Sequence, residues 1–447
     1  MNTASIGILT AAPRWDQTPT RLSGILFLLF FLVIAMRWAH PTPRCVNDEV
    51  RYTEIIGVRT NASALPISGP GYVWLVSNVS TVANVPLPRA VAWVGLIGAA
   101  LLLGTLGWVL HRTVPQLALP AMLAVACTSY FWAGISESRP QLFGCSALVM
   151  ALFLLSEVVC DETVRVRVAL SLLVLSALIA IFHILSFFVF CCLCFAALLA
   201  VQMRQQAQAR AHASRVLMAI LAVGNILIFY PQGLYHVMIA DIVTAHLINP
   251  ALILGVCTAS LLAGILVLSL TRRFGRNIQE IRFSAFFRQS ADRALIGMAA
   301  LAFVLFSIQA ALLPKHYWAV YDHSPLRFAA SQWGNLVYAA FFLWGVRICA
   351  GLIAAGELGR GMIAFVTATG AMVMVAAMFL VISLGLLHTN WMLRAVDYAV
   401  IFGGPIAAYG VMQLWRRNPV GVLFLLSSGA LAGLLAGTKS PLFFATC

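Results

Sequence analysis

The feature that most constrains this chain is its series of apolar runs, each about 20 residues long, the length of a helix that crosses the hydrocarbon core of a bilayer. Of the 447 residues, 62% are hydrophobic and only 9% are charged. A soluble core of this composition would expose too much apolar surface, and a membrane barrel would show short alternating segments instead. The sequence therefore predicts an all-α, polytopic integral membrane protein.

We expect about 13 transmembrane helices, with boundaries read from the apolar runs and their flanking polar residues. The expected spans are 22–39, 90–110, 117–134, 142–159, 168–182, 186–203, 216–230, 251–270, 294–313, 336–355, 362–387, 396–414 and 420–436. The first run is long for a cleavable signal, so we interpret it as a retained span. No internal repeat and no separate soluble domain is evident, so residues 1–447 are expected to form one transmembrane domain.

The formal net charge of +14 comes mainly from basic residues in short loops between the predicted spans. When about 13 spans alternate, these basic loops all fall on one side, which the positive-inside rule assigns to the cytoplasm. The charge therefore does not indicate nucleic-acid binding. The opposite, exoplasmic side receives the segments 40–89, 136–141, 183–185, 231–250, 314–334, 388–394 and 437–447.

The long first exoplasmic loop, at about 40–89, exceeds what two neighbouring helices need, and such loops in compact proteins tend to be functional. Asp48 and Glu49 lie within it, just outside the first span. Asp48 would also suit the N-cap of a short interfacial helix, and local physics leaves catalysis and capping about equally favoured. Pro66, Pro70 and the neighbouring glycines predict that the rest of the loop breaks into short interfacial helices.

The phrase Asp48-Glu49-x-Arg51-Tyr52-x-Glu54 resembles the first exoplasmic loop of the GT-C glycosyltransferases, especially the protein mannosyltransferase and aminoarabinose transferase branch. The resemblance implies a GT-C-like fold and an enzyme that takes a hexose or pentose from a polyprenyl-phosphate donor. It implies that Asp48 is the general base, that Glu49 assists it, and that Arg51 and Tyr52 contact the substrate. Adjacent carboxylates raise each other's proton affinity, which suits a base that works near neutral pH.

A second element, Glu137-Ser138-Arg139-Pro140, resembles the arginine-bearing turn of the same family at the exoplasmic end of the third span. The resemblance implies that Arg139 contacts the phosphate or the sugar, with Glu137 beside it. The alternative is an arginine that snorkels at a helix end next to a carboxylate, a common arrangement in membrane proteins.

Further cations on the exoplasmic side run against the positive-inside rule. They are Lys315, His316, His323 and Arg327 after the ninth span, and Arg394 before the twelfth. Arginine and lysine neutralise phosphate, so these residues are candidates for a clamp around the lipid phosphate. Interfacial anchoring accounts equally well for the aromatic residues among them.

We expect no metal and no cofactor. His183, His236, Asp241 and His246 do not have a diagnostic ligand spacing, and most of the ten cysteines lie in apolar runs, where cysteine behaves as a small hydrophobe. Arg347 and Glu157 lie in or near spans, where an ionisable residue is a functional candidate by default. Both are also close enough to the cytoplasmic end to snorkel, so neither is assigned to the site.

The sequence also departs from the resembled family. Ser68-Gly69-Pro70-Gly71 stands where the aminoarabinose branch has a Lys-Pro-Pro-like element, and no large C-terminal exoplasmic domain is evident. The expected acceptor is therefore a lipid-linked glycan or a cell-surface polysaccharide, with membrane lipids as surroundings and the active site on the periplasmic face of a bacterial inner membrane. Two alternatives stay open: a surface-polysaccharide polymerase or ligase, and a transporter or flippase, which would show broken helices and ionisable residues near the midplane.

Overall fold

The structure is a computed structural model that describes residues 19–39, 70–136, 138–160, 164–202, 207–229, 324–355, 357–383 and 390–437. These residues form 13 helices and no strand, so the predicted all-α class is confirmed for them. The helices are α2 (Pro19–Ala39), α4 (Pro70–Val82), α5 (Leu87–Thr113), α6 (Pro115–Ala126), α7 (Ser129–Ser136), α8 (Pro140–Cys160), α9 (Val166–Phe182), α10 (Ile184–Gln202), α11 (Ala207–Phe229), α16 (Pro325–Ala355), α17 (Arg360–Ser383), α18 (Asn390–Arg417) and α19 (Pro419–Gly437).

Several of these helices have the length and composition of membrane spans. Among the described residues, 4 helices, α5, α8, α16 and α19, are long and apolar enough to cross a bilayer, and the bent pair α6 and α7 would make a fifth. The chain therefore has the architecture of a helical membrane protein. The number of about 13 spans stays a prediction, and the expected spans at 251–270 and 294–313 lie outside the described residues.

The surface of α9 shows how such a helix meets lipid. One stripe along it exposes Val166, Leu170, Val174 and Leu178, large apolar side chains at the spacing of successive helical turns. Buried residues such as Leu172 lie on the other side of the same helix. An apolar stripe that faces outward would be costly in water but suits a hydrocarbon environment.

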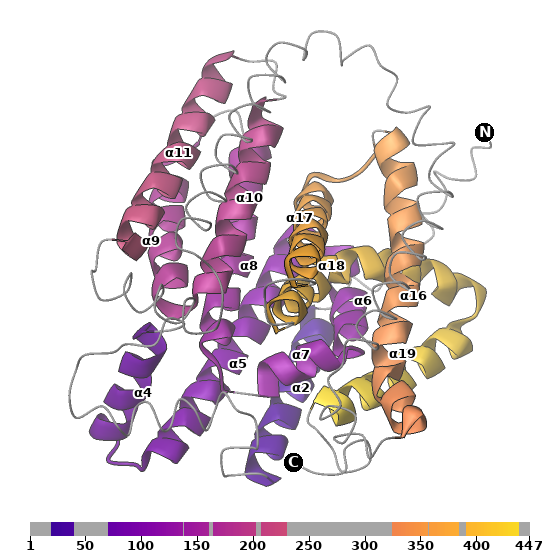
Figure 1. Ribbon diagram of the computed structural model, residues 1–447. Coiled ribbons are helices and arrows are strands. Elements are labelled where there is room, and N and C mark those ends of the chain that lie inside the picture. Colours follow the sequence, from indigo (N-terminus) through magenta and orange to yellow (C-terminus); the bar gives the residue numbers. More distant parts are fainter. Residues whose placement is uncertain are drawn as a thin grey trace.

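Most of the described helices fall into two groups, while α2 and α4 pack against α5 (Figure 1). Helices α8, α9, α10 and α11 pack side by side, and α5 packs against α8. Helices α16, α17 and α19 surround α18, which also packs on α6, while α19 covers α7.

Contacts between helix ends agree with the predicted alternation of sides. At the end predicted to be cytoplasmic, Gly361 approaches the backbone of Thr113, and His212 Nε2 lies 3.4 Å from the carbonyl oxygen of Val164. At the opposite end, Tyr72 of α4 contacts Ser138. Each of these contacts joins segments that the sequence assigns to the same side.

The predicted third span, 117–134, corresponds to two helices and not to one continuous helix. Helices α6 and α7 meet at an angle of 86° across a break at Cys127 and Thr128. The freed backbone groups still find partners: the Phe131 N–H donates to Thr128 Oγ1 at 3.2 Å, and Trp132 Nε1 donates to the Ala126 carbonyl at 2.7 Å. A helix can break at membrane depth only where its backbone groups are satisfied in this way.

Residues far along the chain also hold this break in place. Asn335 of α16 accepts a hydrogen bond from the Ser129 N–H through its Oδ1 at 3.0 Å, and its Nδ2 donates to Ser129 Oγ at 2.9 Å. Gly334 and Gly433 lie so close to the Cys127 carbonyl that a side chain at either position would overlap it. The bend therefore depends on α16 and α19 as well as on its own sequence.

Candidate functional site

Most of the predicted site residues lie outside the described part of the chain. They are Asp48, Glu49, Arg51, Tyr52, Glu137, Lys315, His316 and His323. Their roles stay predictions.

The three predicted arginines, Arg139, Arg327 and Arg394, lie in the described part of the chain. Arg139 lies partly buried between α7 and α8. Arg327 is in the first turn of α16, where its backbone N–H donates to Ser324 Oγ at 3.3 Å. Arg394 lies in the first turns of α18, and its side chain is outside the described set. All three belong to segments predicted to be exoplasmic.

Hydrogen bonds tie the end of the long first loop to the turn that bears Arg139. Tyr72 is fully buried, and its hydroxyl lies 2.7 Å from Ser138 Oγ. Ser138 Oγ donates to the Val91 carbonyl at 2.5 Å, so it accepts from Tyr72. Gly95 allows α5 to approach, since a Cβ there would overlap Ser138. The loop and the turn that the sequence singled out are therefore joined.

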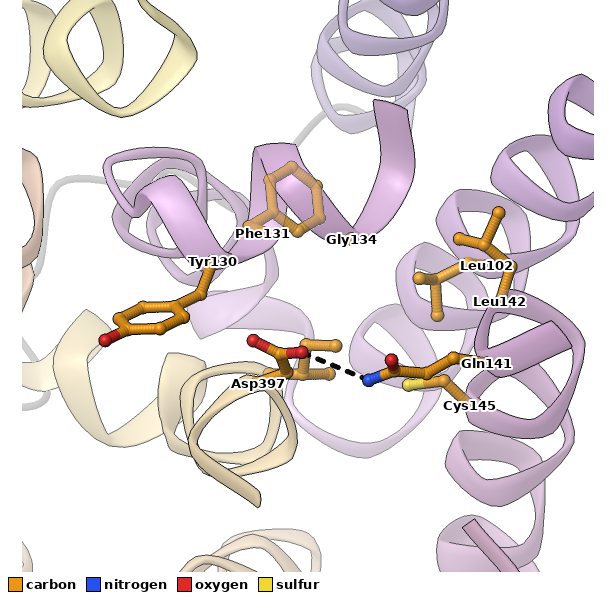
Figure 2. Close-up of a pocket in the computed structure, with 9 residues that line it drawn as sticks. Leu102, Tyr130, Phe131, Gly134, Gln141, Leu142, Cys145 and Asp397 are labelled. Atoms are coloured by element: carbon orange, nitrogen blue, oxygen red, sulfur yellow. Dashed lines mark hydrogen bonds between the residues drawn. The ribbon is translucent and has the colours of Figure 1, made fainter. Parts of the chain in front are cut away.

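A small cavity lies beside this turn, between α5, α7, α8 and α18 (Figure 2). Its volume of about 20 Å³ has room for roughly one water molecule or one hydroxyl group. The lining residues are Leu102, Tyr130, Phe131, Gly134, Gln141, Leu142, Cys145, Asp397 and Ile401. Most of them are apolar, so the polar character of the cavity comes from a few side chains.

Asp397 and Gln141 supply that polarity. Gln141 Nε2 donates to Asp397 Oδ2 at 3.1 Å, and Figure 2 shows the two side chains facing each other. This bond fixes the amide so that Gln141 Oε1 points away from Asp397, and Oε1 has no hydrogen-bond partner among the described residues. Gln141 is only 8% exposed. A buried acceptor without a partner costs about 1–3 kcal/mol, so the pair is suited to a ligand that donates a hydrogen bond.

His183 has a capping role. It is the single residue between α9 and α10, and its Nδ1 accepts a hydrogen bond from the Ser186 N–H at 3.2 Å. Since Nδ1 is an acceptor there, the ring proton is on Nε2. The side chain thereby satisfies one of the backbone N–H groups at the start of α10.

The same histidine belongs to a buried cluster with α18. Ser186 Oγ lies 2.8 Å from His183 Nδ1 and 2.6 Å from the Tyr398 hydroxyl, which itself lies 3.2 Å from Nδ1. Tyr398 follows Asp397 directly in the chain. The turn between α9 and α10 therefore holds the part of α18 that carries the cavity carboxylate.

Sequence reasoning missed Asp397, Gln141 and Tyr398. One signal was available for Asp397, because it lies near the start of the predicted span 396–414, and an ionisable residue in a span is a functional candidate by default. Gln141 and Tyr398 have no comparable signal, since their importance comes from partners on other helices. The described residues include no group of three or more His, Cys, Asp or Glu side chains placed to hold a metal.

No protein-family model matches the chain, and no curated protein matches it either.

Proposed function

We propose that this protein is a membrane glycosyltransferase that moves a hexose or pentose from a polyprenyl-phosphate donor to a lipid-linked glycan or cell-surface polysaccharide on the exoplasmic, periplasmic face of a bacterial inner membrane. The resemblance of the first loop to the GT-C enzymes suggests this function. The observation that carries it is the buried Tyr72–Ser138–Val91 chain of hydrogen bonds, which supports a site shared by the long loop and the arginine-bearing turn.

In the proposed reaction, Asp48 takes the proton from the acceptor hydroxyl, and Glu49 orients that hydroxyl. The acceptor oxygen then attacks the anomeric carbon while the bond from that carbon to the phosphate oxygen breaks. Negative charge grows on the departing polyprenyl phosphate. Arg139, with Lys315, Arg327 and Arg394, would stabilise this charge by charge-assisted hydrogen bonds.

Asp397 and Gln141 have a separate role in this proposal, which is to hold one hydroxyl group of the acceptor or of the transferred sugar. The hydroxyl would donate to Gln141 Oε1, the acceptor that lacks a described partner. Tyr130 lines the same cavity and is only partly buried, so its ring provides aromatic surface of the kind that packs against sugars. Because the cavity has room for little more than one hydroxyl, the sugar ring would lie outside it.

The test is a transfer assay with purified protein in lipid nanodiscs and a panel of radiolabelled polyprenyl-phosphate sugars, with lipid-linked glycans as acceptors. We expect label in a new glycosidic product for at least one donor. Asp48→Asn should reduce the rate by about 100-fold or more, since general-base catalysis contributes typically 10²–10⁴-fold. Transfer at the normal rate by Asp48→Asn, or no transfer with any donor by well-folded protein, would contradict the proposal.

Asp397→Asn tests the hydroxyl-binding pair in the same assay. The substitution weakens the bond that orients the Gln141 amide and with it the hydrogen bond from the ligand hydroxyl to Gln141 Oε1. We expect a rise in acceptor or donor KM that lowers kcat/KM by about tenfold, equivalent to about 1.4 kcal/mol. Glu357→Gln is the matched control, because Glu357 is exposed and lies in the turn between α16 and α17, on the side predicted to be cytoplasmic. Equal effects of the two substitutions on kcat/KM would contradict the proposed role of Asp397 in binding.

A transporter or flippase is a second candidate, favoured by the break between α6 and α7. Transporters place ionisable residues beside discontinuous helices near the midplane, and here α7 contributes Tyr130, Phe131 and Gly134 to the cavity that holds Asp397. Proteoliposomes distinguish the two functions. Movement of a polyprenyl-linked sugar across the bilayer without a new glycosidic bond would favour transport.

A further inference from the structure

A second cluster lies at the opposite ends of the helices, where two arginines share one tryptophan ring. Arg347 Cζ of α16 and Arg417 Cζ of α18 each lie 5.9 Å from the centre of the Trp344 ring. Trp344 Nε1 donates to Gln413 Oε1 of α18 at 3.3 Å, which orients the indole between the two helices. Both guanidinium groups are within the range of favourable cation–π interaction.

This arrangement places two positive charges around one ring. An anion that contacts both guanidinium groups would be attracted by each of them. Arg416 precedes Arg417 in α18, carries a third positive charge at the same end of the helix, and is partly buried. Its Nε is buried and has no hydrogen-bond partner among the described residues. A guanidinium N–H in this situation favours an acceptor such as a phosphate oxygen.

The cluster lies beside a surface suited to acyl chains. Helix α19 begins at Pro419, directly after the arginine pair, and its Val420, Leu423 and Phe424 are 76%, 56% and 67% exposed. These three residues follow the spacing of one helix face. The basic loops place this end on the predicted cytoplasmic side, where anionic lipid headgroups attract arginine and lysine.

We propose that Trp344, Arg347, Arg416 and Arg417 form a binding site for the phosphate headgroup of an anionic phospholipid, whose acyl chains lie along Val420, Leu423 and Phe424. Guanidinium groups supply paired N–H donors to phosphate oxygens, and the oriented indole has two of those groups within 5.9 Å of its ring centre. The site is independent of the proposed glycosyl transfer, since it lies at the other end of the helices.

The experiment measures lipid binding to the purified full chain in detergent by native mass spectrometry, together with the thermal unfolding temperature. The lipids are cardiolipin, phosphatidylglycerol and phosphatidylcholine, and inorganic phosphate is a separate arm. We expect the anionic lipids to bind at least tenfold more tightly than phosphatidylcholine and to raise the unfolding temperature. Stabilisation of the same size by inorganic phosphate alone would overturn the assignment to a lipid.

Two double variants test whether the site is specific. Arg416→Gln with Arg417→Gln should reduce the preference for anionic lipid by about tenfold or more. Arg165→Gln with Arg167→Gln is the matched control, because it removes the same charge from two exposed arginines predicted to lie on the same side. Equal losses of the preference for anionic lipid in the two double variants would show that the attraction is nonspecific, and would overturn the proposed site.

A third double variant protects the test against misfolding. Arg416→Lys with Arg417→Lys keeps the charge but removes the paired donors of the guanidinium group. We expect a smaller loss of preference than in the Gln variant, with normal elution on size exclusion. Full retention of the preference in this variant would contradict the proposed guanidinium–phosphate geometry.

Discussion

The close approach of α16 and α18 gives the sharpest prediction, since one helix carries both the test and its control. A Cβ at Gly345 would overlap the carbonyl oxygen of Ile406 on α18, whereas a Cβ at Gly351 would meet nothing within 4 Å. Substitution of each glycine by alanine makes the same chemical change in the same helix. Any difference between the two variants therefore reports the helix–helix contact.

The expected magnitudes follow from two opposing effects. Alanine is favoured over glycine in a helix by about 0.5–1 kcal/mol, so Gly351→Ala should be neutral or stabilising by that amount. Gly345→Ala gains the same increment but must push two backbones apart, and overpacking costs about 1–3 kcal/mol. Small residues at such crossings are what allow membrane helices to approach closely. We expect Gly345→Ala to be less stable than Gly351→Ala by about 1–3 kcal/mol.

The assay is unfolding of the purified protein in mixed detergent micelles, titrated with a denaturing detergent and followed by tryptophan fluorescence. Both variants are compared with the unmodified chain at equal protein and detergent concentrations. Equal midpoints for Gly345→Ala and Gly351→Ala would contradict the close approach of α16 and α18. They would mean that a methyl group fits at position 345 without moving either backbone.

The same unfolding assay tests two other features of the fold. Tyr398→Phe removes the hydroxyl that bonds to Ser186 and His183, and should lower the free energy of unfolding by about 0.6 kcal/mol and at most about 1.7. Tyr409→Phe, at a partly buried tyrosine of the same helix, should change it less, and the reverse order would contradict the role given to the cluster. Asn335→Leu leaves the Ser129 N–H without its acceptor and should cost about 1–3 kcal/mol. It should also speed alkylation of the buried Cys127 at the break, measured by peptide mass spectrometry, and an unchanged rate would argue against the clamp.

Hydropathy was enough to locate several of the described helices, because a bilayer fixes the length of a span and requires each backbone group to bond within its own helix. The predicted spans 90–110, 142–159 and 420–436 correspond to α5, α8 and α19 within a few residues. The alternation of basic loops likewise indicated which segments share a side, and Tyr72 and Ser138 do meet. Hydropathy and loop charge predict helix positions and the side of each segment because both depend on depth in the membrane.

Which helices are neighbours could not be predicted from hydropathy, because hydropathy is the same for any arrangement of spans. The break between α6 and α7 lies inside an apolar run, and the asparagine that clamps it is 206 positions from Ser129. Tyr398 is 215 positions from His183, and Asp397 is 256 from Gln141. Each of these polar contacts is a match between side chains on different helices. The role of a buried polar side chain depends on its hydrogen-bond partner, and the local sequence pattern does not predict that partner.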